Sequence, residues 1–276
     1  MHVFYSLGMK IPAAQAANLN TPPDPVHPDN DDAIVGKIYS RRRALQMLGL
    51  SGAALGLAAC DTAGAAGAAG KTATATSAVS NLSCVVRPSA TEGPFWTDNK
   101  LVRSDVRPDT RSGKLSAGTP LSLTFQVAQY AASGCTNLGG ALVDIWQCDA
   151  LGHYSGENGD TGDFLRGEQL TGAGGKASFT TVYPGWYNGR TVHIHFRIRT
   201  LDAAGQVRSN FTSQLFFPDA TTDTAFTAAP YNTRGSRTTR NGADNIYGNT
   251  GDTMLLDLSG DSKKGYAGTF MVGLKL

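Results

Sequence analysis

The stretch Arg190-Thr191-Val192-His193-Ile194-His195-Phe196-Arg197-Ile198 decides the fold of this chain. Its strict alternation predicts a β-strand, because every second side chain of a strand points to the same face. One face then presents the imidazoles of His193 and His195, and the other faces a core with Val192, Ile194, Phe196 and Ile198. Two neutral imidazoles at this separation can bind one metal ion. A phenol from the turn Tyr183-Pro184-Gly185-Trp186-Tyr187 could reach the same place, so an iron site is the first hypothesis.

Other alternating or apolar runs predict further strands around the histidine strand. We expect a strand at each of 121–127, 140–149, 177–182, 211–217 and 268–276, and a short helical turn at 223–229. The 33 glycines and 12 prolines indicate that many turns connect these strands. The expected fold is therefore all-β, a β-sandwich of mostly antiparallel strands with the metal site on loops and one strand.

The composition fits one sizeable domain preceded by a leader. The chain has 276 residues, of which 41% are hydrophobic and 17% charged, and its formal net charge is +2. Its basic residues are scattered and are not interleaved with aromatic ones, which argues against a nucleic-acid surface. No internal repeat and no nucleotide-binding glycine pattern is evident in the sequence.

Residues 1–60 have the character of an export leader. The stretch Ser40-Arg41-Arg42-Arg43-Ala44-Leu45 resembles a twin-arginine signal, and the apolar run at 44–59 is too short and glycine-interrupted to span a membrane. The run ends in Leu57-Ala58-Ala59-Cys60, which resembles a lipobox, so we expect Cys60 to be lipidated. The alternative is an ordinary cleaved signal with an incidental cysteine. Both alternatives predict export to the periplasm or cell envelope, and lipidation would anchor the protein there.

A linker and a disulfide are expected after the leader. Residues 61–80 are almost entirely Ala, Gly, Thr and Ser, which predicts a flexible linker, and the folded domain covers 81–276. An oxidising compartment favours a disulfide. Cys84 opens the domain and Cys135 lies in an expected loop, whereas Cys148 lies in a strand-like run, so we expect Cys84 to pair with Cys135. The alternative is three free thiols.

Several short motifs follow one another along the domain. They are Thr91-Glu92-Gly93-Pro94-Phe95-Trp96, the run from Val143 to Tyr154, Pro184-Gly185-Trp186-Tyr187, Arg190-Thr191-Val192-His193-Ile194-His195 and Thr212-Ser213-Gln214. In this order they resemble the intradiol ring-cleavage dioxygenases, the family of catechol 1,2-dioxygenase and protocatechuate 3,4-dioxygenase. The resemblance covers most of residues 84–276. In the first motif Phe95 or Trp96 replaces the family's usual tyrosine, which alters the expected wall of the substrate pocket.

The resemblance implies a non-haem Fe(III) cofactor held by two tyrosinates and two imidazoles, those of Tyr154, Tyr187, His193 and His195. Phenolate is a hard and strongly donating ligand, and two phenolates favour Fe(III). By resemblance, Tyr154 and His195 are the equatorial ligands, with a bound hydroxide. Tyr187 is an axial ligand, as is His193, and Tyr187 is also catalytic because it leaves and takes up a proton when substrate binds.

Two further catalytic residues are implied by the resemblance. Arg190 matches the family's active-site arginine, whose fixed guanidinium can stabilise developing negative charge, and Gln214 matches a glutamine that supports the site. The bland alternatives are a surface arginine and a solvated strand glutamine. Tyr183 is expected in the core, and His153 is expected to face away from the site. Trp146 and Trp186 are expected to serve packing.

The implied function is cleavage of a catechol-type ring between its two hydroxyl-bearing carbons, with O2, to give a cis,cis-muconate-type diacid. The expected partners are a catechol or hydroxybenzoate-type aromatic and O2, with no nucleic acid and with a membrane contact only through Cys60. A homo-oligomer is compatible with the sequence. One alternative is a non-catalytic β-sandwich binding module tethered to the envelope. Another is a zinc or copper hydrolase built on His193 and His195, for which the sequence offers no convincing third histidine.

Overall fold

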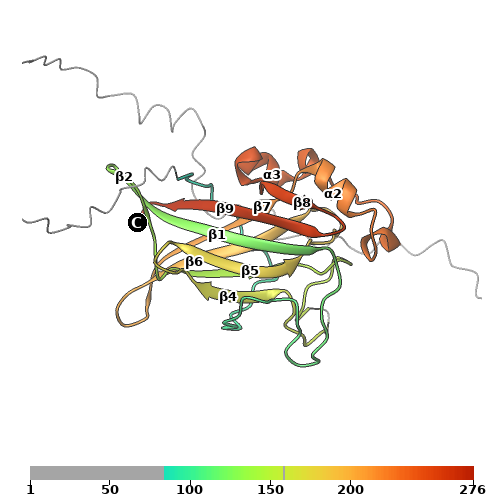
Figure 1. Ribbon diagram of the computed structural model, residues 1–276, viewed down its shortest axis with the longest axis horizontal. Helices are drawn as coiled ribbons and strands as arrows, with labels where there is room; N and C mark the ends of the chain where they lie inside the picture. The colour runs from blue at the N-terminus through green and yellow to red at the C-terminus, as the bar shows by residue number, and fades with distance from the viewer. Residues whose placement is uncertain (1–83, 158) are drawn as a thin grey trace, which may run out of the picture.

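Two β-sheets form a sandwich in the computed structural model, which describes residues 84–157 and 159–276 (Figure 1). Sheet A has the order β2-β1-β9-β8, with β5 also paired to β1. Its strands are β1 (Pro120–Ala131), β2 (Gly134–Asn137), β5 (Lys176–Val182), β8 (Leu258–Asp261) and β9 (Gly265–Leu274). Sheet B has the order β4-β3-β6-β7, made of β3 (Leu142–Trp146), β4 (Arg166–Leu170), β6 (His193–Leu201) and β7 (Val207–Phe216). The paired strands are antiparallel except β1 with β9, so the predicted all-β sandwich is confirmed.

Every strand expected from the sequence is present, with shifted ends. The strand expected at 140–149 is the shorter β3, and the histidine strand begins only at His193. Strands β2, β4 and β8 are additional, since they are short and mostly polar and carry no apolar alternation. The helical turn expected at 223–229 is α2, which covers Asp219–Ala225 and follows directly after Pro218.

Short helical segments lie together at the end of the sandwich opposite the C-terminus (Figure 1). Besides α2 they are η2 (Tyr231–Arg234), η3 (Asn241–Ala243), α3 (Asn245–Thr250) and η4 (Gly251–Met254). Asp244 is the N-cap of α3, and its carboxylate accepts a hydrogen bond from the backbone N–H of Tyr247 at 2.9 Å. This cap fixes an acidic side chain close to the start of β6. Within the described residues no helix is long and apolar enough to cross a membrane.

The core lies between the inner faces of the two sheets. Ile194, Phe196 and Ile198 of β6 are fully buried, as their alternation predicts. The Phe196 ring lies 5.1 Å from that of Phe125 on β1 and 5.6 Å from that of Phe270 on β9, which joins the two sheets through aromatic contacts. The histidines of β6 therefore point away from this core, onto the outer face of sheet B.

The N-terminal segment covers that outer face. Ala90 donates its backbone N–H to Thr212 on the edge strand β7, while Leu101 and Arg103 exchange backbone hydrogen bonds with Glu168 on the opposite edge strand β4. The residues between these two anchor points, 91–100, must therefore cross the outer face of sheet B. This crossing buries polar side chains that would otherwise face water.

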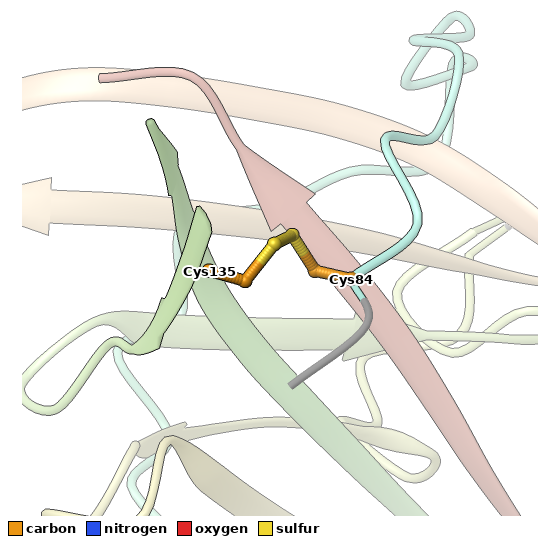
Figure 2. Close-up of a disulfide and its surroundings, with 2 residues drawn as sticks. All are labelled: Cys84 and Cys135. Carbon is orange, nitrogen blue, oxygen red and sulfur yellow. A yellow bond between two sulfur atoms is a disulfide. The ribbon is translucent and has the colours of Figure 1, made fainter. Parts of the chain in front are cut away.

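A disulfide joins Cys84 to Cys135, which confirms the expected pairing (Figure 2). The disulfide ties the start of the described chain to β2. Cys135 therefore lies in a short strand, whereas the sequence predicts a loop there. Cys148 is a free, buried thiol. The expected leader at 1–60, the linker at 61–80 and the lipidation site Cys60 lie outside the described residues.

Candidate metal centre

Four side chains converge on one point at the outer face of sheet B. His193 and His195 come from β6, Tyr154 from the loop after β3, and Tyr187 from the turn after β5. The Nε2 atom of His193 lies 3.1 Å from Nε2 of His195, 3.2 Å from the Tyr187 hydroxyl and 3.4 Å from the Tyr154 hydroxyl. These are the four residues that the sequence predicts as metal ligands, and the fold brings all of them together.

Both imidazoles are neutral. Burial, followed by the charge of Arg190, lowers the pKa of His193 to about 3. Burial and the neighbouring His193 lower the pKa of His195 well below its ordinary value. Nδ1 of His193 lies 2.6 Å from the carbonyl oxygen of Thr191, which requires the proton on Nδ1. The lone pair of Nε2 is then directed at the centre of the cluster, where a cation could accept it.

Two glycines allow the two tyrosine-bearing loops to approach each other. A Cβ atom on Gly152 would lie 2.2 Å from the carbonyl oxygen of Trp186, and one on Gly185 would lie 2.5 Å from that of Ala150. Gly152 also has a φ of +81°, which L side chains rarely adopt. The Asp149 carboxylate accepts backbone hydrogen bonds from Leu151 and His153 and fixes the first loop. The backbone around the two phenols is therefore closely packed and pre-positioned.

Arg190 is buried beside the cluster and is held by two side chains. Its Nε donates to Asp244 at 2.9 Å, and its Nη2 donates to the amide oxygen of Gln214 at 2.6 Å. Gln214 in turn donates to the carbonyl oxygen of Thr91 at 3.0 Å. Burial alone would raise the pKa of the Asp244 carboxyl, but the Arg190 guanidinium and two backbone N–H groups hold it below its usual value. The site thus contains a fixed guanidinium, placed where the sequence predicts it.

Aromatic rings form the surroundings of the cluster. Trp146 stacks on His195 with ring centroids 5.0 Å apart and planes 9° apart, and this contact orients the imidazole. Phe95, on the crossing segment, stacks on Tyr154 at 4.3 Å and meets Tyr187 edge-on at 6.2 Å. The rings of Trp146 and Phe95 therefore flank the cluster, the first against His195 and the second against Tyr154.

The comparisons with known proteins agree with this geometry. Residues 91–229 match the sequence model of the family described as Dioxygenase. The solved structure of an intradiol ring-cleavage dioxygenase from Tetranychus urticae is 30% identical, with 70% of this chain and 94% of that chain covered and a TM-score of 0.59. The chain belongs to the intradiol ring-cleavage dioxygenases. The dioxygenase domain of a carbohydrate-binding fusion protein from Streptomyces sp. SirexAA-E is also 30% identical, covering 70% and 99% of the two chains, with a TM-score of 0.50.

No curated protein sequence matches the chain. Membership of the family makes the chain an oxidoreductase that cleaves catechol-type rings in general, and enzymes of this family generally depend on Fe(III). The expectation of an enzyme is therefore confirmed, and the non-catalytic binding module is set aside. The described part of the chain holds no group of three or more His, Cys, Asp or Glu side chains suited to a metal. In this dioxygenase the convergent donors are instead two imidazoles and two phenols.

Two residues that the sequence excludes from the site are indeed elsewhere. The Tyr183 ring is fully buried and packs against Phe217, and its hydroxyl lies 2.8 Å from that of Thr222. Burial raises the pKa of Tyr183, which keeps its hydroxyl protonated. The His153 side chain is 70% exposed and lies 3.7 Å from Asp149. Tyr183 therefore packs in the core of the dioxygenase, and His153 lies on its surface.

Other residues of the site escape sequence reasoning. Asp244 binds Arg190 from 54 positions away, and Arg166 binds the carbonyl oxygen of Phe95 from 71 positions away. The N-cap pattern at Asp244 signals a helix start but not its partner. Cys148 packs with Trp146 and Tyr154, but burial raises the pKa of its thiol to about 12, so it is a neutral neighbour of the site.

Proposed function

We propose that this dioxygenase binds a non-haem Fe(III) through Tyr154, Tyr187, His193 and His195. In this proposal it cleaves a catechol-type ring between the two hydroxyl-bearing carbons, with O2, to give a cis,cis-muconate-type diacid. The single observation that carries the proposal is the convergence of two phenol oxygens and the Nε2 atom of His195 at 3.1–3.4 Å from His193 Nε2.

The donor set fits ferric iron. Phenolates are hard anionic ligands that favour Fe(III), and zinc sites rarely use them. Nδ1 of His195 is buried without a hydrogen-bond partner among the described residues, while its Nε2 faces Nε2 of His193. Without a metal ion, these two nitrogen atoms form a hydrogen bond only if one of them carries a proton. A bound metal ion would instead accept the lone pairs of both nitrogen atoms. The absence of a third histidine near this pair argues against the hydrolase alternative, as far as the described residues extend.

The residues divide the work of binding and proton transfer. Bound Fe(III) would supply the site that takes both catechol oxygens and makes the ring reactive toward O2. Tyr154 is buried under Phe95, which suits a ligand that stays in place. Tyr187 is only half-buried, which suits a phenol that leaves and takes up a substrate proton. Arg190, fixed by Asp244 and Gln214, provides a positive charge that needs no rearrangement during the reaction.

The test is metal analysis and turnover on one preparation of the protein. We expect purified protein to contain iron, to be red to burgundy from tyrosinate charge transfer, and to consume O2 with a catechol while forming the diacid. Tyr187→Phe should keep much of the iron but bind catechols slowly, whereas Tyr154→Phe should chiefly change colour and iron retention. Tyr130→Phe, at an exposed position of β1, is the matched control and should change neither property. A colourless, iron-free protein after iron supplementation would refute the proposal.

We also propose that the dioxygenase is exported and anchored by a lipid on Cys60. The disulfide between Cys84 and Cys135 supports export, because such bonds persist in oxidising compartments. Replacing Arg41 and Arg42 together by Lys should hold the precursor in the cytoplasm, and Cys60→Ala should move the mature protein from membrane to soluble fractions. Normal fractionation of both variants would reject this part of the proposal.

A further inference from the structure

The crossing segment is held down on sheet B by arginines from two strands. The strand register places Arg166, Trp146, His195 and Gln214 in one row across the outer face, and Glu168, Asp144, Arg197 and Thr212 in the next row. The first row contains His195 of the candidate metal centre and Gln214, which binds Arg190. The second row lies directly beside it, and the crossing residues Glu92, Phe95 and Trp96 contact side chains of both rows.

Arg197 holds two residues of the segment at once. Its guanidinium lies 3.9 Å above the centre of the Trp96 ring and pairs with the carboxylate of Glu92. Its Nε also donates to the hydroxyl of Thr212 at 3.2 Å, which fixes the side chain on the sheet. The Arg197 side chain is 8% exposed, so the guanidinium itself is largely shielded from water, whereas the Glu92 side chain is 46% exposed. The stack on Trp96 is therefore the stronger of the two contacts, because water and salt weaken the pair with the exposed carboxylate.

The acidic side chains next to Arg197 on sheet B pair with another arginine, so Arg197 pairs with the crossing segment. Arg199, the next residue on the same face of β6, binds Asp144 at 2.8 Å and Glu168 at 2.9 Å. Both acidic side chains are therefore occupied by Arg199. Among the described residues, Glu92 is the carboxylate paired with Arg197, so the crossing segment itself supplies the counter-charge.

Arg166 fastens the neighbouring residue of the segment to the loop of Tyr154. Its Nη1 donates to the carbonyl oxygen of Phe95, its Nε donates to the Ser155 hydroxyl at 2.9 Å, and its Nη2 donates to the Ser155 carbonyl oxygen at 2.7 Å. Through these bonds the backbone of Phe95 and the residue after Tyr154 share one buried guanidinium. The stacking of Phe95 on Tyr154 at 4.3 Å is the result.

We propose that Arg197 is a positioning residue for substrate binding: by holding Trp96 and Glu92 on sheet B, it keeps Phe95 seated as a preformed aromatic wall beside Tyr154 and Tyr187. This inference rests on the proposed function, since it assumes that a catechol occupies the space beside that wall. A wall that is already in place reduces the ordering that substrate binding requires. Loss of Arg197 should therefore weaken binding of the ring and leave the chemistry of the bound substrate almost unchanged.

The test compares Arg197→Met and Arg197→Lys with wild type. For Arg197→Met we expect the KM for catechol to rise about tenfold and kcat to stay within about threefold, as when binding shared by ground and transition states is removed. Arg197→Lys keeps the charge but loses the planar stack, so its KM should be intermediate. Iron content and the colour of the protein should not change. Trp96→Leu should raise KM similarly, and the double variant should add little to either single change.

Arg87→Met is the matched control, because Arg87 stacks on Phe270 of sheet A at 4.3 Å, and its loss should leave KM unchanged. Hydrogen exchange gives a readout that needs no iron: amides of residues 91–99 should exchange faster in Arg197→Met than in wild type or in Arg87→Met. Unchanged KM together with unchanged exchange would overturn the proposal, as would a loss of kcat and iron with KM unchanged. Should the wild-type protein cleave no catechol, the proposed function fails, and hydrogen exchange alone then decides whether Arg197 holds the segment.

Discussion

The strands of both sheets alternate inward and outward side chains, but the outward side chains of the two sheets differ in burial. On sheet A several outward residues are small hydroxyl side chains, such as Thr124 and Ser178, whose hydroxyls lie 3.0 Å apart on the surface. On sheet B the outward residues His193, His195 and Arg197 are almost fully buried beneath the crossing segment. Burying polar groups costs free energy unless each one is hydrogen-bonded. Several adjacent buried polar side chains on one sheet face therefore indicate a functional site more than a source of stability.

The largest expected effect is the loss of a candidate ligand from the outer face of sheet B. His195→Ala removes one of the two imidazoles, and a three-donor remnant retains a metal less well. We expect most of the iron and all measurable ring cleavage to disappear, as seen by metal analysis and O2 uptake. His153→Ala, at an exposed histidine, should retain both properties. Equal iron content in the two variants would show that the buried face is not the metal centre.

The next effect concerns the carboxylate that holds Arg190. Asp244→Asn preserves the shape of the side chain but leaves the guanidinium, 1% exposed, without its charged partner. Removing one member of a buried ion pair costs about 3–5 kcal/mol, and the neutral amide should recover part of this. We expect denaturant unfolding to show a loss of about 2–4 kcal/mol. Turnover should also fall, because Arg190 would no longer be fixed.

A matched substitution on the surface makes this measurement specific. Asp257 is exposed, and Asp257→Asn should change the free energy of unfolding by at most about 0.5 kcal/mol. Comparable losses in the two variants would mean that charge alone, and not burial beside Arg190, determines the cost.

The alternation of β6 made the histidine face and its core partners predictable, because a strand period is visible in local sequence. The two phenols were not predictable in this way. Tyr154 and Tyr187 lie on loops, where no period applies. The turn after β5 suggested that one of its phenols could reach the site, but only the resemblance to the dioxygenase family selected Tyr187 and identified Tyr154. The roles of Arg166 and Arg197 were missed because they depend on where a distant segment crosses the sheet. No local pattern encodes that crossing, since its anchor points are backbone hydrogen bonds to β4 and β7.

A smaller effect is expected on the pH dependence of the free energy of unfolding, through Asp144 on the outer face of sheet B. Burial raises the pKa of Asp144 to about 7; Arg199 opposes this shift, and Glu168 reinforces it. The folded protein then holds a proton on Asp144 that the unfolded chain releases near pH 4, so this group's contribution to stability falls as pH rises from about 4 through 7. Asp144→Asn should flatten the pH dependence of the free energy of unfolding over this range. A steeper dependence in the variant would contradict the assignment.

The smallest effect is expected on the outer face of sheet A. Ser178→Ala removes the hydroxyl that bonds Thr124, but both groups face water, which can replace that bond. The change in the free energy of unfolding should be within about 0.5 kcal/mol, with iron content, KM and kcat unchanged. A loss above 1.5 kcal/mol, well outside this range, would mean that sheet A's outer face is also covered, for instance by a second copy of the chain, and measuring the effect at several protein concentrations would reveal it. In that case both outer faces would be covered, that of sheet B by the crossing segment of the same chain and that of sheet A by a second chain.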